Sequence, residues 1–218
     1  IQMIILGRPN NPTGNACDAI TLQKLTAACQ FRKIFLVVDE AFIDFWDTRQ
    51  SALIVTKDHP YRVIVRSMTK FYGLAGIRLG FGVMHPGIRR CLEKYQIPWS
   101  VNAVAQSAGV ASLADREYFV DTRKWAREQR RYLESEMTAV SAFQVFPSKV
   151  NFLLFRLLDD AAGLPFKLFS HLIHKKILIR NCGNFRGLDE RYFRVAVRNF
   201  DDNRRLMNAI RSFFVPGE

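Results

Sequence analysis

The chain has 218 residues, 49% of them hydrophobic and 12% aromatic, which is enough to bury a core in one large or two small domains. No apolar run approaches the roughly 20 residues that a membrane-spanning helix needs, and the first residues have neither the basic region nor the cleavage site of a signal peptide. The net charge of +12 suits nucleic-acid binding, but the sequence contains no RNA or DNA motif, so we expect no nucleic-acid partner. Because no apolar run is long enough, we expect no membrane partner either.

Two groups of strands are expected along the chain. Apolar runs predict strands near residues 2–6, 34–39, 62–66 and 79–84, with a helix from about Asp18 to Phe31. From about Tyr118 a long helix leads to further strands near residues 143–146, 151–156, 177–179 and 193–197, and a final helix covers residues 201–214. Asp18 and Asp115 are predicted to cap helix starts. The expected fold class is α/β, with a mostly parallel sheet in residues 1–115 and a smaller α+β domain in residues 116–218.

The cysteines and histidines predict neither disulfides nor a metal centre. The four cysteines lie far apart without a C-x-x-C pair, which favours reduced thiols and a cytoplasmic protein. His171 and His174 share a helix face, but no third ligand accompanies them. We therefore expect no bound metal.

The most informative segment follows the third predicted strand. Lys70 stands three residues after Ser67 in a glycine-rich loop, and Arg78 follows eight residues later. An amine beside an anion-binding arginine suits a cofactor that carries an aldehyde and a phosphate, such as pyridoxal 5'-phosphate. Upstream, Asp39 ends a buried apolar strand, and the turn at residues 9–14 holds Asn11 in place. Ligands of open α/β sheets lie at such strand ends.

Each of these residues has a role in pyridoxal-phosphate chemistry. Lys70 can bond covalently to the aldehyde, Asp39 can keep the pyridine nitrogen protonated, and Asn11 can hydrogen-bond the ring oxygen. Ser67 and Arg78 would hold the phosphate. Singly, each has an ordinary explanation as a surface lysine, a cap or a plain turn. Their joint occurrence in this order favours the cofactor site.

These segments resemble the fold-type-I pyridoxal-phosphate enzymes of the aminotransferase superfamily, in the branch that contains histidinol-phosphate aminotransferases and threonine-phosphate decarboxylases. The likeness covers nearly the whole chain and is strongest to the decarboxylases of cobalamin biosynthesis. It is carried by residues 9–14, 39–45, 66–78, 97–103, 177–182, 187–189 and 192–198. The resemblance implies that residues 1–115 are the C-terminal part of the large, cofactor-binding domain.

The resemblance also implies an activity and a substrate site. It predicts decarboxylation of L-threonine O-3-phosphate to (R)-1-aminopropan-2-yl phosphate by a homodimer. Arg194 corresponds to the residue that binds the substrate carboxylate, Arg180 to one that reaches the substrate phosphate, and Asn11 also lies at the substrate. Transamination of histidinol phosphate and a non-catalytic interaction fragment remain alternatives.

The chain departs from its relatives at three points. Phe42 stands where many relatives have a tyrosine whose hydroxyl bonds the cofactor ring oxygen. Arg8 precedes Pro9 where asparagine is usual, and we interpret this change as peripheral. The chain opens in the strand before Asn11, without the arm and glycine-rich loop expected of the superfamily. We therefore expect a fragment that holds only part of the cofactor site.

Overall fold

The computed structural model describes residues 1–55 and 59–214. Contacts within the chain divide it into two compact units. The first unit consists of Ile1–Asn11 and Asn15–Arg123, and the second of Pro12–Gly14 and Lys124–Glu218. The α/β fold class is confirmed, whereas a domain boundary between residues 115 and 116 stays a prediction.

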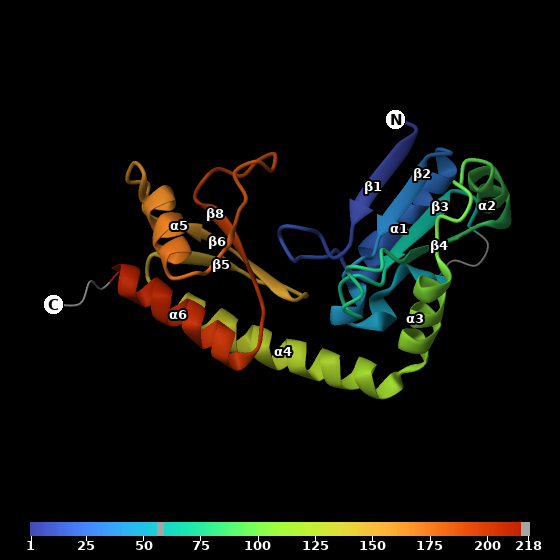
Figure 1. The fold of residues 1–218 in the computed structure, drawn as a ribbon. Coiled ribbons are helices and arrows are strands. Elements are labelled where there is room, and N and C mark those ends of the chain that lie inside the picture. The colour runs from blue at the N-terminus through green and yellow to red at the C-terminus, as the bar shows by residue number, and fades with distance from the viewer. Residues whose placement is uncertain (56–58, 215–218) are drawn as a thin grey trace. The chain divides into compact units, whose positions relative to one another are not determined.

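A four-stranded sheet forms the centre of the first unit (Figure 1). Strands β1 (Met3–Gly7), β2 (Phe35–Asp39) and β3 (Arg62–Ser67) run parallel, and β4 (Gly80–Met84) runs antiparallel to β3. Helix α1 (Ala19–Phe31) joins β1 to β2. It begins after Asp18, whose carboxylate accepts the Thr21 N–H at 2.6 Å, so this predicted cap is confirmed.

The two faces of this sheet differ in burial. Side chains alternate along a strand, so Leu36, Val38 and Ile64 share the face that packs against α1 and are fully buried. On the other face Met3 is 52% exposed and Ile5 is 72% exposed. The core of the first unit therefore lies on the α1 side of the sheet.

Short helices complete the first unit. Three 3-10 turns, Ile43–Phe45, Thr48–Gln50 and Ala52–Val55, follow β2, and α2 (Pro86–Glu93) and α3 (Ala103–Ala114) follow β4. Helix α3 is not among the elements expected from the sequence, because its alanine-rich run has no clear apolar stripe. Its start is marked instead by Asn102, whose side-chain oxygen accepts the Ala105 N–H at 2.8 Å.

An antiparallel sheet forms the centre of the second unit. Its strands lie in the order β5 (Phe143–Phe146), β6 (Phe152–Leu157), β8 (Tyr192–Ala196) and β7 (Arg180–Asn181). Helices α5 (Leu164–His174) and α6 (Phe200–Phe214) and the second half of α4 (Arg116–Thr138) supply apolar side chains to one face. The buried core on that face includes Leu133, Leu168, Phe155, Phe193, Val195 and Met207.

Two predictions for this part of the chain have clear outcomes. The cap at Asp115 is confirmed, since its carboxylate accepts the Tyr118 N–H at 2.8 Å. The strand predicted at residues 177–179 is wrong, because β7 comprises only Arg180–Asn181. The Ile177 N–H instead donates to the Leu172 carbonyl at 2.8 Å, so this residue takes part in the turn that follows α5.

Candidate active site

The predicted cofactor residues lie at the carboxyl ends of the three parallel strands. Asn11 follows β1, Asp39 is the last residue of β2, and Ser67 is the last residue of β3. Asp39 pairs in register with Gly7 on one side and Val65 on the other. Asp39 and Ser67 therefore occupy one edge and one face of the sheet, the face turned away from α1.

Lys70 stands in the loop that follows β3. Its side chain is exposed, and its ammonium nitrogen lies 5.8 Å from the centroid of the Phe42 ring. Phe42 follows Asp39 by three residues, so the lysine loop lies against the loop that carries the acid. The Asp39 carboxylate accepts the Ala41 N–H at 2.9 Å, and the hydroxyls of Ser67 and Thr69 are hydrogen-bonded at 2.7 Å.

Buried side chains anchor the lysine loop. Met68 and Phe71 are almost completely buried, and the Phe71 carbonyl accepts the Tyr118 hydroxyl at 2.9 Å. Burial raises the pKa of the neighbouring Tyr72 to about 12. Lys70 thus stays exposed between two anchored residues.

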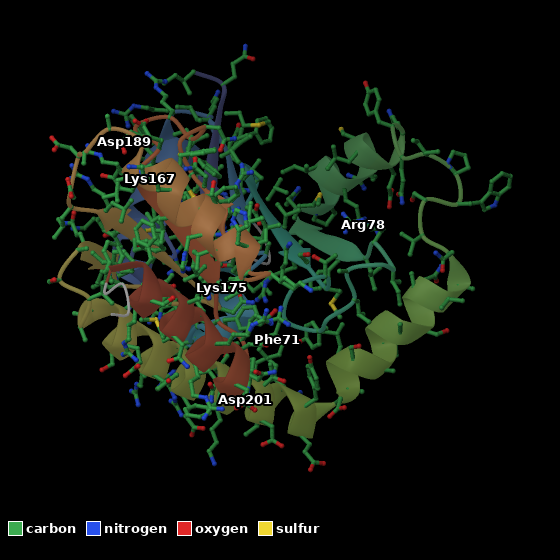
Figure 2. All side chains as sticks on the ribbon, turned by 60° about the vertical axis from the view of Figure 1, so that its left-hand side comes forward. Phe71, Arg78, Lys167, Lys175, Asp189 and Asp201 are labelled. Atoms are coloured by element: carbon green, nitrogen blue, oxygen red, sulfur yellow. The ribbon has the colours of Figure 1, made fainter. Side chains whose placement is uncertain are left out.

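Arg78 is held in an unusual backbone conformation. It has a φ of 59°, in the left-handed region that non-glycine residues rarely adopt, and its guanidinium donates to the Ala75 carbonyl at 3.1 Å. Figure 2 labels Arg78 together with Phe71 on the segment between β3 and β4. Strain of this kind accumulates at ligand sites, which agrees with the anion-binding role predicted for Arg78.

The donor set in the first unit fits pyridoxal phosphate. It offers an exposed amine for the aldehyde at Lys70 and an exposed carboxylate for the pyridine nitrogen at Asp39. Asn11 supplies an amide, and Ser67 and Arg78 supply a hydroxyl and a guanidinium for the oxygen atoms of the cofactor. Among the described residues, no three histidine, cysteine or acidic side chains are grouped to hold a metal ion.

The two predicted substrate arginines lie side by side in the second unit. Arg180 of β7 and Arg194 of β8 are Cα partners, so their side chains share a face of the sheet. Phe193 and Val195 point to the helix-covered core, so the arginines occupy the opposite face. Two guanidinium groups at paired positions form a site suited to an anion.

The surroundings of the two arginines differ. The Arg194 guanidinium lies 4.9 Å from the centroid of the Phe152 ring, and burial lowers its pKa, with a further contribution from the charge of Arg180. Arg180 is exposed and donates to the Asn184 side-chain oxygen at 2.9 Å. Arg194 is therefore the more enclosed cation, and Arg180 the more accessible one.

One sequence interpretation is wrong, because Arg8 is not peripheral. Its side chain is completely buried, and its guanidinium lies 3.7 Å from the carboxylate of Glu40, which is also completely buried. Glu40 is not among the residues predicted from the sequence, because it directly follows the more conspicuous Asp39. Alternation along the strand places neighbouring side chains on opposite faces, so Asp39 and Glu40 had to point to different faces, but it does not say which of them meets the core.

The fold and the donor set together define an α/β protein with a pyridoxal-phosphate type of site. Residues 1–210 match the family described as aminotransferase class I and II. The chain belongs to that family, and the predicted cofactor is confirmed at this level, because the family is pyridoxal-phosphate-dependent. No helix in the described ranges, 1–55 and 59–214, has the length and apolar character to cross a bilayer.

The individual relatives are named for two different enzyme activities, decarboxylation and transamination. The chain is 36% identical to the threonine-phosphate decarboxylase of Salmonella typhimurium, over 97% of this chain and 57% of that protein. It is also 36% identical to the histidinol-phosphate aminotransferase of Symbiobacterium thermophilum, over 97% of this chain and 56% of that protein. The crystal structure of the histidinol-phosphate aminotransferase from Clostridium acetobutylicum superimposes with a TM-score of 0.92 at 30% identity, over 98% of this chain and 64% of that one.

These comparisons support the family and leave the reaction open. Equal identity to a decarboxylase and to an aminotransferase does not separate the two activities. The chain spans a little more than half the length of these two curated relatives, at 57% and 56%.

Proposed function

We propose that this chain belongs to a pyridoxal-phosphate-dependent decarboxylase of O-phosphorylated amino acids, which converts L-threonine O-3-phosphate to (R)-1-aminopropan-2-yl phosphate for cobalamin biosynthesis. The observation that carries the substrate class is the cross-strand pair Arg180 and Arg194. A substrate with a carboxylate and a phosphate presents two anions, one for each guanidinium. We further propose that the enzyme is a cytoplasmic homodimer.

The residues of the first unit would hold and tune the cofactor. Bound pyridoxal phosphate supplies an electron sink for the bond that breaks at the substrate Cα. Asp39 keeps a proton on the pyridine nitrogen, and Asn11 donates to the ring oxygen. Ser67 and Arg78 bind the phosphate, and the Lys70 amine binds the aldehyde and later carries a proton at Nζ.

The paired arginines would select which bond of the substrate breaks. Decarboxylation requires the bond from Cα to the carboxylate to stand perpendicular to the cofactor ring. Arg194 binds the carboxylate, and Arg180 binds the phosphate at the other end of the substrate. Fixing both ends restricts rotation about the Cα bonds, which is how positioning lowers a barrier.

Transamination of histidinol phosphate is the alternative, and the similarity to the aminotransferases favours it. It would use the same Lys70, Asp39, Asn11 and phosphate-binding arginine. Product analysis separates the two reactions. The decarboxylase releases carbon dioxide and an aminopropanol phosphate, whereas the aminotransferase releases a keto product and leaves the amino group on the cofactor.

The test begins with the purified chain and added pyridoxal phosphate. We expect a visible absorbance band that borohydride removes while it leaves the cofactor covalently attached to the chain. The band should be missing in Lys70→Ala and should persist in Lys24→Ala, where an exposed lysine of α1 is removed instead. Threonine phosphate is then supplied, and carbon dioxide is measured. The absence of a lysine-dependent band would contradict the proposal for this chain and favour a non-catalytic fragment.

A further inference from the structure

The strand ends that carry the candidate cofactor residues also carry three charged side chains on the opposite face of the sheet. Arg8 follows β1, Glu40 follows β2, and Arg66 is the penultimate residue of β3. We call these three residues the strand-end cluster. By the alternation of side chains, they point toward the α1 side, whereas Asp39 and Ser67 point away from it.

Glu40 is the centre of the strand-end cluster. It is completely buried, and its carboxylate lies 3.1 Å from Nε of Arg66 and 3.7 Å from Nη1 of Arg8. It also accepts the Ser51 hydroxyl at 2.7 Å and the Ala52 N–H at 2.6 Å. One carboxylate thus connects β1, β2, β3 and the segment that follows β2.

The two arginines extend these connections. Arg8 donates from Nε to the Cys17 carbonyl at 2.9 Å and from Nη1 to the Gln50 carbonyl, and its guanidinium lies 5.2 Å from the Trp46 ring centroid. Arg66 donates to the Asp44 carboxylate at 2.8 Å and to the Ser51 hydroxyl at 3.0 Å. Both arginines of the strand-end cluster therefore bind groups in the segment that follows β2.

The backbone at the same strand ends is joined as well. The Arg8 N–H donates to the Asp39 carbonyl at 2.8 Å, and the Glu40 N–H donates to the Val65 carbonyl at 2.8 Å. The single peptide group that joins Asp39 to Glu40 is thus bonded on one side to the residue after β1 and on the other side to β3. Any shift of the Glu40 side chain pulls on the backbone that aims Asp39.

We propose that Glu40, held between Arg8 and Arg66, is a positioning residue that sets the relative placement of Asn11, Asp39 and Ser67. The inference rests on the proposed function of those three residues. Buried ion pairs often stabilise a fold no better than apolar side chains of the same size, so stability alone does not explain a charged cluster here. Geometric precision at a cofactor site does explain it, because catalytic groups need tightly held neighbours.

The test compares Glu40→Gln with Arg62→Gln. Arg62 serves as the control, since it is also a buried charged residue of this sheet, 1% exposed. It lies at the opposite end of β3 and donates to Thr26 of α1 at 3.3 Å. Both variants remove a buried charge. Glu40→Gln removes a carboxylate that directly contacts the strand ends, whereas Arg62 makes its hydrogen bond to Thr26 at the other end of the sheet.

The first measurement needs no cofactor. Amide hydrogen exchange of Ala41 reports on the orientation of Asp39, because the Asp39 carboxylate accepts that N–H. We expect exchange at Ala41 to be about tenfold faster in Glu40→Gln than in Arg62→Gln, as one loosened hydrogen bond would produce. Equal exchange in the two folded variants would overturn the proposal.

The second measurement is pyridoxal phosphate affinity, followed by the absorbance of the bound cofactor. We expect the Kd to rise about tenfold in Glu40→Gln, as for loss of outer-shell support at metal sites, and to change less than about twofold in Arg62→Gln. If the native chain binds no cofactor, the proposed function fails for this chain, while faster Ala41 exchange still supports the positioning role.

A milder variant covers the case in which Glu40→Gln does not fold. Arg8→Asn introduces the residue usual in the resembling sequences and leaves Glu40 its contact with Arg66. We expect changes in the same direction, about threefold in Ala41 exchange, because only one of the two cations is removed. If Ala41 exchanges at the native rate in Arg8→Asn and Glu40→Gln does not fold, the strand-end cluster has only a structural role and the proposal is refuted.

Discussion

Replacing Arg180 by methionine tests whether this arginine serves the substrate or the fold. The substitution relieves the repulsion of Arg194 at the paired position, worth about 0.2–1 kcal/mol between opposed like charges. It removes the exposed hydrogen bond to Asn184, worth about 0.5–1.5 kcal/mol. It also removes the contact with Phe185, whose ring centroid is 5.9 Å away, worth about 0.5 kcal/mol at an exposed site.

The two losses together are about 1–2 kcal/mol and are partly offset by the gain of about 0.2–1 kcal/mol. We expect the free energy of unfolding of Arg180→Met, measured with urea, to fall by less than about 2 kcal/mol. Binding should respond more strongly. A charge-assisted contact to phosphate is worth about 1.5–3 kcal/mol, so the Kd for L-threonine O-3-phosphate should rise roughly tenfold to hundredfold.

The assay is calorimetric titration of the chain with threonine phosphate, with Arg204→Met as the matched control. Arg204 is an exposed arginine of α6, on the side of the sheet that faces away from Arg180 and Arg194, and its removal changes the net charge equally. The control should bind as the native chain does. Equal affinity in both variants, or a loss of stability above about 2 kcal/mol in Arg180→Met, would refute the substrate role.

Three further changes probe other parts of the chain. Phe42→Tyr restores a hydroxyl beside Lys70 and should lower the Kd for pyridoxal phosphate by up to about tenfold, as measured by absorbance titration; an unchanged Kd would place Phe42 away from the ring oxygen. Gly14→Ala should cost about 1–3 kcal/mol in urea unfolding, because Gly14 has a φ of 70° and an added Cβ would collide with Ser148. Gly187→Ala, with a φ of 85° and open space around it, should cost less, and the reverse order would contradict this explanation. Burial raises the pKa of the Cys182 thiol, so the unfolded chain loses this proton first and stability should fall as pH rises above the ordinary thiol pKa of about 8.5, a slope that Cys182→Ala should lessen in urea unfolding.

Local patterns predicted most of the fold. Apolar runs located strands β1 to β4, and side-chain caps located the starts of α1 and α4. The pattern failed at α3, where alanine-rich sequence carries no stripe, and at residues 177–179, where the Ile177 N–H bonds the Leu172 carbonyl of α5. In both places the spacing of apolar residues does not show which hydrogen bonds the backbone makes.

The candidate site was likewise predicted only in part from the sequence. Sequence order alone placed Asn11, Asp39, Ser67 and Lys70 after successive strands, because the carboxyl ends of parallel strands share one edge of a sheet. The resemblance to the aminotransferase superfamily named Arg180 and Arg194. It did not reveal that they are paired across two strands, because register depends on partners far apart in the chain.

The sequence by itself determined the chemistry available to this protein: a lysine, an acid and an amide at strand ends, and an excess of arginine. Tertiary structure alone decided which charges are buried and which face outward. Arg8 and Glu40 are charged residue types that usually lie at the surface, yet both are completely buried in the strand-end cluster. The physical reason is that burial depends on what packs against a residue, and the alternation of a strand states only that neighbours differ, not which of them meets the core.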